Sequence, residues 1–216
     1  MMTIKGIRQR ISNIYRKVLA LLRRIKLNKT KFTIFSNNCW GGGVYESYDL
    51  IKQSPTVGLF FMSSDYVKFL GNIKGYLKQP LVFINPKNSK YYDKLKRETD
   101  YGKYPVAKLD DIEIFFMHYT DEQQALSKWN RRIKRINWNH VLYKFNDQNG
   151  CTQEDIDNFI KLPYKNKICF TVRDDYVKAP YIIKIKAPKS HHYIRYEYEP
   201  YGNNKYINVN KLINKL

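Results

Sequence analysis

Apolar and polar positions alternate in two different ways along this chain. From residue 32 onward, short and nearly continuous apolar or aromatic runs predict strands that are covered on both faces. These runs occupy residues 32–35, 56–62, 81–85, 112–119, 141–145 and 168–172. Helical spacing predicts helices at residues 44–51, 65–77, 120–136 and 152–160, with a short one near 209–216. This alternation predicts an α/β fold: a single three-layer domain over residues 31–216 with a mainly parallel sheet.

Two of the predicted helices have recognisable starts. Ser64 is placed to cap the helix at 65–77, and Thr120 and Gln123 have the spacing of a capping box for the helix at 120–136. Along this second helix, four apolar side chains share one face: Leu126, Trp129, Ile133 and Ile136. We expect that face to pack inward and the basic residues near the helix end to lie elsewhere.

Residues 1–30 follow a different pattern. Apolar side chains recur at steps of three and four between Ile4 and Ile25, which is the period of one helix face. Residues 1–31 carry ten basic side chains and no acidic one, so half of the net charge of +20 lies on this short arm. The pattern predicts an N-terminal basic amphipathic helix.

Three interpretations of this arm remain open. A cationic amphipathic helix can lie among the headgroups of an anionic membrane surface, here through residues 3–27. The apolar stripe could instead pack on the protein's own core or on a partner, with the basic face in solvent. The charges would also suit nucleic acid, but no helix-turn-helix, zinc finger or aromatic RNA-binding motif accompanies them. The sequence favours the membrane surface and disfavours nucleic acid.

Cysteine usage and hydropathy indicate the compartment. Cys39, Cys151 and Cys169 are widely spaced and form no CxxC pair, which argues against a zinc site and a disulfide framework and favours a reducing compartment. No secretory signal is recognisable, and no run of about eighteen apolar residues is present. We expect a cytoplasmic protein, peripheral at the inner face of the membrane.

The stretch "FSNNCWGGG" follows the first predicted strand and precedes a predicted helix, a place where ligands collect in open parallel sheets. Glycines such as Gly41 and Gly42 allow positive φ and a close approach of backbone amides to an anion. Asn37 and Asn38 could contact sugar hydroxyls, and Trp40 could stack on a base or a sugar ring. The stretch has neither the Walker pattern nor GxGxxG, so a plain structural turn stays open.

Several stretches together resemble a bacterial family, the domain-of-unknown-function family 1919. They span about residues 32–180 and read "FSNNCWGG", "SPTVGLFF", "DYVKFL", "YPVAKLDDIEIFFMHY", "KWNRRIKRIN" and "LPYKNKICFT". Members of this family are often labelled exopolysaccharide biosynthesis proteins. The resemblance implies a role near surface-polysaccharide assembly, as a glycosyltransferase, and assigns no catalytic residue.

Glycosyl transfer from a nucleotide sugar needs a general base for the acceptor hydroxyl and positive charge for the departing diphosphate. The predicted strand at 112–119 ends in His118 and Tyr119. His118 is our candidate base, with Asp121 and Glu122 as alternatives, and Tyr119 is a candidate substrate contact. A histidine at the end of a strand is more often a hydrogen-bonded structural residue, so that interpretation stays open.

Positive charge could come from two places. Arg131 and Arg132 could bind phosphate through paired donors, although a solvated helix end would have the same sequence. Lys144 and Asp147 surround the end of another predicted strand and could add charge to the same rim.

Two further chemistries fit less well. Asp110, Asp111 and Glu113 loosely resemble a DxD motif but precede a strand, so we expect a mechanism without a metal cofactor and leave a divalent ion open. Cys39, next to glycines and amides, could have a lowered pKa and act as a nucleophile with His118. A cysteine buried as a small apolar residue fits better.

The sequence therefore favours a surface- or exopolysaccharide biosynthesis protein, a membrane-peripheral glycosyltransferase that uses a nucleotide sugar and a glycan acceptor. A non-catalytic module of a polysaccharide-assembly complex is the first alternative, docking through the arm and the tyrosine-rich C-terminal segment. A nucleic-acid-binding protein is the second.

Overall fold

The computed structural model describes residues 4–216, with side chains from residue 8 onward. Its main sheet consists of β1 (Thr33–Ser36), β5 (Val141–Asn146), β6 (Lys167–Thr171) and β7 (Ile182–Lys184), in the order β1-β5-β6-β7. All three strand pairs are parallel, and the register places Thr33 opposite Val141. The predicted α/β fold with a mainly parallel sheet is confirmed.

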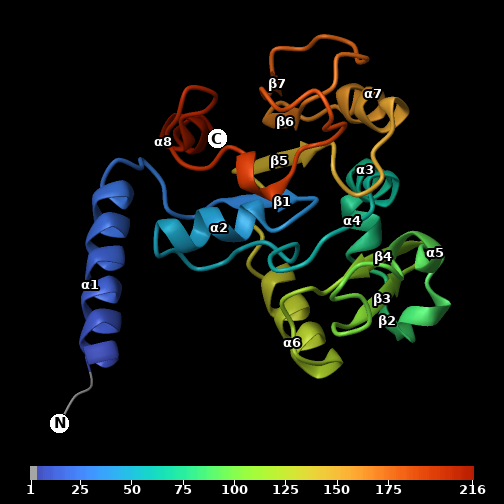
Figure 1. Ribbon diagram of the computed structural model, residues 1–216, viewed down its shortest axis with the longest axis horizontal. Helices are drawn as coiled ribbons and strands as arrows, with labels where there is room; N and C mark the ends of the chain where they lie inside the picture. The colour runs from blue at the N-terminus through green and yellow to red at the C-terminus, as the bar shows by residue number, and fades with distance from the viewer. Residues whose placement is uncertain (1–3) are drawn as a thin grey trace.

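Helices cover both faces of this sheet (Figure 1). On one face, α2 (Trp40–Ser47) and α8 (Val209–Asn214) pack over apolar strand residues that include Ile34, Leu142 and Phe170. On the other, α3 (Ser63–Gly71) and α7 (Gln153–Lys161) pack over Phe35 and Phe145. Because strand side chains point alternately to opposite faces, adjacent residues such as Ile34 and Phe35 supply two separate cores.

A second sheet was not predicted. It is antiparallel, in the order β2-β3-β4, and its strands are β2 (Leu81–Ile84), β3 (Val106–Leu109) and β4 (Ile112–Phe115). A tight turn at Asp110, with φ at 59°, joins β3 to β4. Short helices connect the two sheets and the strands of this one: α4 (Ile73–Tyr76), η1 (Pro86–Asn88) and α5 (Tyr92–Leu95).

The strand predicted at residues 56–62 is wrong. This apolar segment contains turns and the positive-φ Gly58, and it runs between the two sheets without joining a ladder. Phe60 exchanges backbone hydrogen bonds with Phe115 of β4, while the Phe61 amide donates to the Asn37 carbonyl beyond β1. The segment is apolar on all sides because both sheets cover it. The strand predicted at 112–119 likewise ends at Phe115, since the next residues turn back toward Gly58.

Several predicted helix boundaries shift. The helix predicted at 65–77 is two helices, because Asn72 breaks it and its side chain caps α4 by accepting from the Gly75 amide. Met62, not Ser64, precedes α3. The helix predicted from Thr120 is α6 (Glu122–Ile133), and Asp121 caps it by accepting from the Gln124 amide at 2.7 Å.

The predicted N-terminal helix is α1 (Ile4–Arg24), which stands beside the body at the opposite end of the molecule from the antiparallel sheet (Figure 1). The contacts that the structure describes attach it at its C-terminal end: Arg23 donates to the Ser47 carbonyl, and Asn214 donates to the carbonyl of Lys26 just after the helix. The large apolar side chains of its stripe are exposed, namely Ile11, Ile14, Val18, Leu21, Leu22 and Ile25.

Packing of that stripe on the protein's own core is therefore wrong for residues 11–25. Thr3 and the side chains of Ile4, Lys5 and Ile7, which belong to the predicted membrane-binding arm, lie outside the described part. Within the residues that the structure describes, no helix combines the length and the hydropathy that crossing a bilayer requires.

Candidate functional site

The carboxyl ends of β1 and β5 place polar residues side by side. The two strands pair from Thr33 and Val141 to Ser36 and Lys144, so the residues that follow them leave the sheet together. Asn37 and Asn38 continue from β1, and Asn146 ends β5. This is the edge at which open α/β sheets bind ligands.

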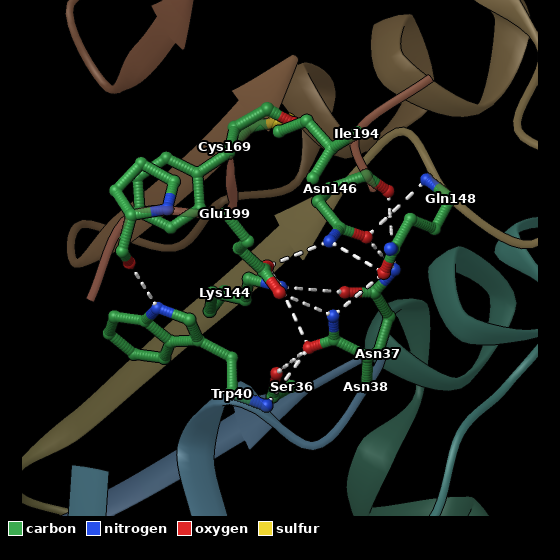
Figure 2. A network of polar contacts seen from close by, with 12 residues as sticks. Ser36, Asn37, Asn38, Trp40, Lys144, Asn146, Gln148, Cys169, Ile194 and Glu199 are labelled. Atoms are coloured by element: carbon green, nitrogen blue, oxygen red, sulfur yellow. Dashed lines mark hydrogen bonds and ion pairs between the residues drawn. The ribbon is translucent and has the colours of Figure 1, made fainter. Parts of the chain in front are cut away.

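These side chains form one hydrogen-bond network, with the dashed contacts drawn in Figure 2. Asn37 donates to the Asn146 side chain at 2.8 Å. Asn38 donates to Gln148 at 2.8 Å and to Glu199 at 2.9 Å, and it accepts from the Lys144 amine at 2.8 Å. Among the described residues, every enclosed side-chain nitrogen or oxygen has a partner. The two asparagines that we predicted to read sugar hydroxyls are thus bonded within the chain.

A buried ion pair lies at the centre of the network. Lys144 and Glu199 are in contact, and their side chains are 0% and 1% exposed. Burial lowers the pKa of Lys144, and the neighbouring Glu199 carboxylate opposes that change. Glu199 belongs to the C-terminal segment that follows η2 (Tyr196–Tyr198), so the pair ties this segment across the sheet edge. Sequence reasoning missed Glu199, because nothing in its local pattern distinguishes it from its exposed acidic neighbour Glu197.

Trp40 is buried against the same C-terminal segment. Its indole N–H donates to the Pro200 carbonyl at 2.7 Å, and its ring stacks on Tyr201 with centroids 6.1 Å apart. The ring that we predicted to stack on a base or sugar is therefore covered by the protein itself.

The glycine stretch is the first turn of α2 and not a loop, which corrects our prediction. Neither Gly41 nor Gly42 has a positive φ. A Cβ on Gly41 would lie 3.1 Å from Ile34 Cγ2, and one on Gly42 would lie 3.0 Å from Val57 Cγ1. Glycine is needed here because the helix packs closely on β1 and on the segment at Val57.

Two other candidate residues, Cys39 and Asp147, lie where burial disfavours their charged forms. Burial raises the pKa of Cys39 to about 11, so the lowered pKa considered for a nucleophile is wrong. Asp147 accepts from the Thr171 hydroxyl and from the amides of Val172 and Ile194, and burial raises its pKa. Lys144 and Asp147 therefore do not form an exposed rim. They join the C-terminal segment to the sheet.

A second group of residues lies around Val57 and Gly58, beside the first turn of α2. Arg132 is buried on α6 and donates to the Val57 carbonyl at 2.8 Å and to the Tyr119 hydroxyl. Tyr119 in turn donates to the Val57 carbonyl at 2.5 Å, and burial raises its pKa. Thus the guanidinium that the sequence suggested as part of a solvated helix end is enclosed, and both acceptors are neutral oxygens.

Further positive charges surround this arginine. Lys128 lies over the Tyr119 ring, with its amine 5.2 Å from the ring centroid, and Arg131 is exposed on the same helix. The pKa of Lys128 is lowered by burial and then by the positive charges of Arg132, Lys52 and Arg131. We call Lys52, Lys128, Arg131 and Arg132 the basic surface.

The basic surface is poorly neutralised. Of the ion pairs found from residue 8 onward, one joins Lys52 to Glu46, and none includes Lys128, Arg131 or Arg132. Asp121 opposes the lowering of the Lys128 pKa, but it also serves as the cap of α6. Sequence reasoning missed Lys128 and Lys52, although the run "KWNRRIKR" contains one of them.

His118 lies next to the basic surface. Its backbone amide donates to the Gly58 carbonyl at 3.0 Å, and its side chain is exposed. A Cβ on Gly58 would lie 3.6 Å from His118 Cβ, and one on Gly42 would lie 3.9 Å from the Gly58 nitrogen. The structure therefore brings Gly42, His118, Tyr119 and Arg132 together around Gly58. Glu122 is exposed in the first turn of α6.

Two of the three acidic residues weighed as metal ligands have protein partners, and the third, Asp110, is exposed in the turn between β3 and β4. Asp111 contacts Lys68 and accepts from the Tyr76 hydroxyl, and Glu113 accepts from Ser89 and from the Lys90 amide. Among the described residues, no group of three His, Cys, Asp or Glu side chains could hold a metal ion.

The basic surface can attract an anion, whereas the polar network at the ends of β1 and β5 leaves no enclosed hydrogen-bonding group of the described residues free for a ligand. Exposed Arg131 and half-buried Lys128 offer charged donors beside an exposed imidazole, which is the combination that binds phosphate and accepts a proton. The buried network, by contrast, already uses its donors and acceptors.

Comparisons with known proteins identify a family and give no activity. A profile described as "Domain of unknown function (DUF1919)" matches residues 10–216. An uncharacterized protein from Haemophilus influenzae is 36% identical over 160 residues, covering 74% of this chain and 71% of that protein. The profile match takes in most of α1 and the segment that carries Glu199.

Proposed function

This chain belongs to the DUF1919 family, and we propose that it is a membrane-peripheral glycosyltransferase that binds the diphosphate of a nucleotide sugar at its basic surface. The acceptor is a glycan, and the process is surface-polysaccharide assembly. The observation that carries the proposal is Arg132, a buried guanidinium with neutral acceptors, in a group of like charges.

The electrostatics of the basic surface support an anionic ligand. Bringing like charges together is unfavourable, and burial makes each charge costlier. Lys128, Arg131 and Arg132 carry this cost without an ion-pair partner among the described residues. A diphosphate would neutralise these positive charges and accept hydrogen bonds from them. The same charges would stabilise the diphosphate as it leaves during transfer.

His118 supplies the proton acceptor in this proposal. A general base must reach the acceptor hydroxyl. His118 is exposed next to Gly58, which has no side chain of its own. Tyr119 and Arg132 hold the Val57 carbonyl and so position the Gly58 turn.

The test is a thermal-shift titration of the full chain with nucleoside diphosphates and nucleotide sugars, with and without Mn²⁺. Ligand at 100 times its Kd stabilises a protein by about 2.7 kcal/mol, which is measurable. We expect Lys128→Gln and Arg131→Gln to weaken this shift, while Arg135→Gln, which removes an exposed charge just after α6, leaves it intact. His118→Ala should keep the shift and lose transfer.

A folded protein that shows no shift with any nucleotide would contradict the proposal. The second candidate, a non-catalytic assembly module, would then gain support, and one observation already favours it. The network at the sheet edge is closed by the C-terminal segment, and the exposed α1 stripe is available to a partner. A module would bind its complex equally well with Lys128→Gln and His118→Ala.

A further inference from the structure

A cavity of about 410 Å³ lies near the amino ends of the parallel strands, opposite the polar network at their carboxyl ends. Trp138, just before β5, lines it together with Tyr143 of β5 and Tyr164, which precedes β6. Asn72 and Lys74, at the junction of α3 and α4, form the opposite side. The volume falls within the range of small-molecule sites, which are typically lined by aromatic side chains and a few polar groups.

The aromatic lining is rigid and partly open. Tyr143 and Tyr164 stack with centroids 3.8 Å apart, and Tyr143 also stacks on buried Phe35. Trp138 leans on the same Phe35 with centroids 6.1 Å apart, yet its side chain is 42% exposed. The indole is therefore partly uncovered where it lines the cavity.

The polar groups of the cavity are mainly free donors. The amine of Lys74 lies 5.3 Å from the centre of the Trp138 ring, and no carboxylate pairs with it in the described part of the chain. In the same part, neither the Tyr143 hydroxyl nor the Trp138 N–H has a hydrogen-bond partner. The Tyr143 hydroxyl is not an enclosed unsatisfied atom, so it is open to solvent, and Trp138 is itself exposed. The Asn72 side chain caps α4 and lies against Gly75, so it borders the cavity without offering a free donor.

We infer that this cavity binds an acidic sugar unit, one pyranose ring carrying a carboxylate. The aliphatic hydrogens of such a ring can rest on the indole, as apolar faces do on aromatic side chains. Its carboxylate complements Lys74, and its hydroxyls can accept from the indole and phenol donors. A nucleobase fits less well, because it has no carboxylate to complement the Lys74 amine. This inference does not rest on the proposed function, since the cavity and the basic surface share no residue.

The tryptophans make a direct test available. Trp40 and Trp129 are buried, so a ligand that contacts indole in this cavity changes the fluorescence of Trp138. We would titrate the full chain with galacturonic acid and its short oligomers, with glucose and with uridine monophosphate. The sugar acids should change the emission and bind more tightly than glucose. Trp138→Phe should remove the fluorescence response while keeping the fold.

Charge is tested with Lys74→Gln, which should weaken sugar-acid binding by about tenfold, as expected for losing one hydrogen bond between charged groups. Lys78→Gln, which removes an exposed lysine that does not line the cavity, is the matched control and should bind normally, by calorimetry. Lys128→Gln should also bind normally, which separates this site from the basic surface. Binding that is unchanged in Lys74→Gln, tighter binding of the nucleotide, or no binding to the folded protein would each overturn the inference.

Discussion

Two buried cations are satisfied in different ways. Lys144 contacts the Glu199 carboxylate and the Asn38 side chain, so its charge is compensated inside the protein. Arg132 has the Val57 carbonyl and the Tyr119 hydroxyl, which accept its hydrogens without cancelling its charge. Removing one partner of a buried ion pair typically lowers the unfolding free energy of a protein by about 3–5 kcal/mol. We infer from this contrast that Lys144 stabilises the fold, whereas the uncompensated charge of Arg132 adds to the positive potential of the basic surface.

Cys39 gives a pH prediction at the same scale. Its pKa rises from 9.0 to about 11 because burial disfavours the thiolate, so the folded protein holds the proton through the alkaline range. At pH 8 this lowers the thiolate fraction by about 100-fold, and the thiolate is the reactive form. We expect alkylation of Cys39 by iodoacetamide to be slow and to keep rising with pH up to about 11. Pulse labelling followed by peptide mass spectrometry measures it.

The urea-unfolded chain is the control for this experiment, and its rate should level off near pH 9. The shape of the pH curve separates a raised pKa from simple shielding, because shielding lowers the rate without moving the midpoint. Rapid labelling of folded protein at neutral pH would return Cys39 to the candidate nucleophiles.

At the scale of elements, the close packing of α2 makes a second prediction. Gly42→Ala would place a methyl group 3.0 Å from Val57 Cγ1, so the helix or the Val57 segment must shift. We expect a loss of about 1–3 kcal/mol in unfolding free energy, as for other overpacked sites. Gly71→Ala is the matched control, because a Cβ there meets nothing within 4 Å. It should stabilise the protein by about 0.4–1 kcal/mol, and urea denaturation measures both. Equal effects of the two would contradict this account of the glycine stretch.

The elements that the sequence predicted best are those with a strong local signal. Residues 141–145 and 168–172 are largely apolar because the sheet is covered on both faces, and both are strands within a residue or so. Thr152 begins α7 through a capping box with Asp155, close to the predicted start. By contrast, β3 contains Lys108, lies in a short hairpin and has no apolar run to reveal it.

The parts that escaped prediction depend on distant residues. Residues 56–62 are apolar for the same reason as a buried strand, and only the tertiary fold shows that they lie between two sheets. Glu199 meets Lys144 across 55 positions in the chain. Arg132 and Arg131 are neighbours in sequence with the same side chain, yet one is buried and the other exposed, because helix rotation turns only one of them toward Val57.

At the scale of the whole molecule, different chemistries occupy separate places. The carboxyl edge of the parallel sheet carries the closed network, with the basic surface next to it, and the other edge carries the aromatic cavity. The α1 helix joins the body beside α2 and α8, far from the antiparallel sheet (Figure 1). If α1 contacts a membrane, the helix itself therefore covers neither the basic surface nor the aromatic cavity.

The last prediction concerns that helix. From residue 8 onward α1 presents Arg8, Arg10, Arg16 and Lys17 together with an exposed apolar stripe, a composition that suits anionic headgroups. At about 1 kcal/mol for each basic residue near the surface, these four charges supply roughly 4 kcal/mol of attraction. We expect the protein to sediment with phosphatidylglycerol vesicles at low salt and to remain in solution with pure phosphatidylcholine.

Two variants separate the contributions of charge and apolar insertion. Arg10→Gln combined with Arg16→Gln should reduce binding and its salt dependence, because fewer charges remain to be screened. Ile11→Ser combined with Ile14→Ser keeps every charge and should reduce the binding that survives at high salt. Both pairs of residues are exposed and make no described contact with the body, so each variant should unfold at the wild-type denaturant concentration. Equal binding to both kinds of vesicle, or binding unaffected by either variant, would leave the α1 stripe as a surface for a protein partner.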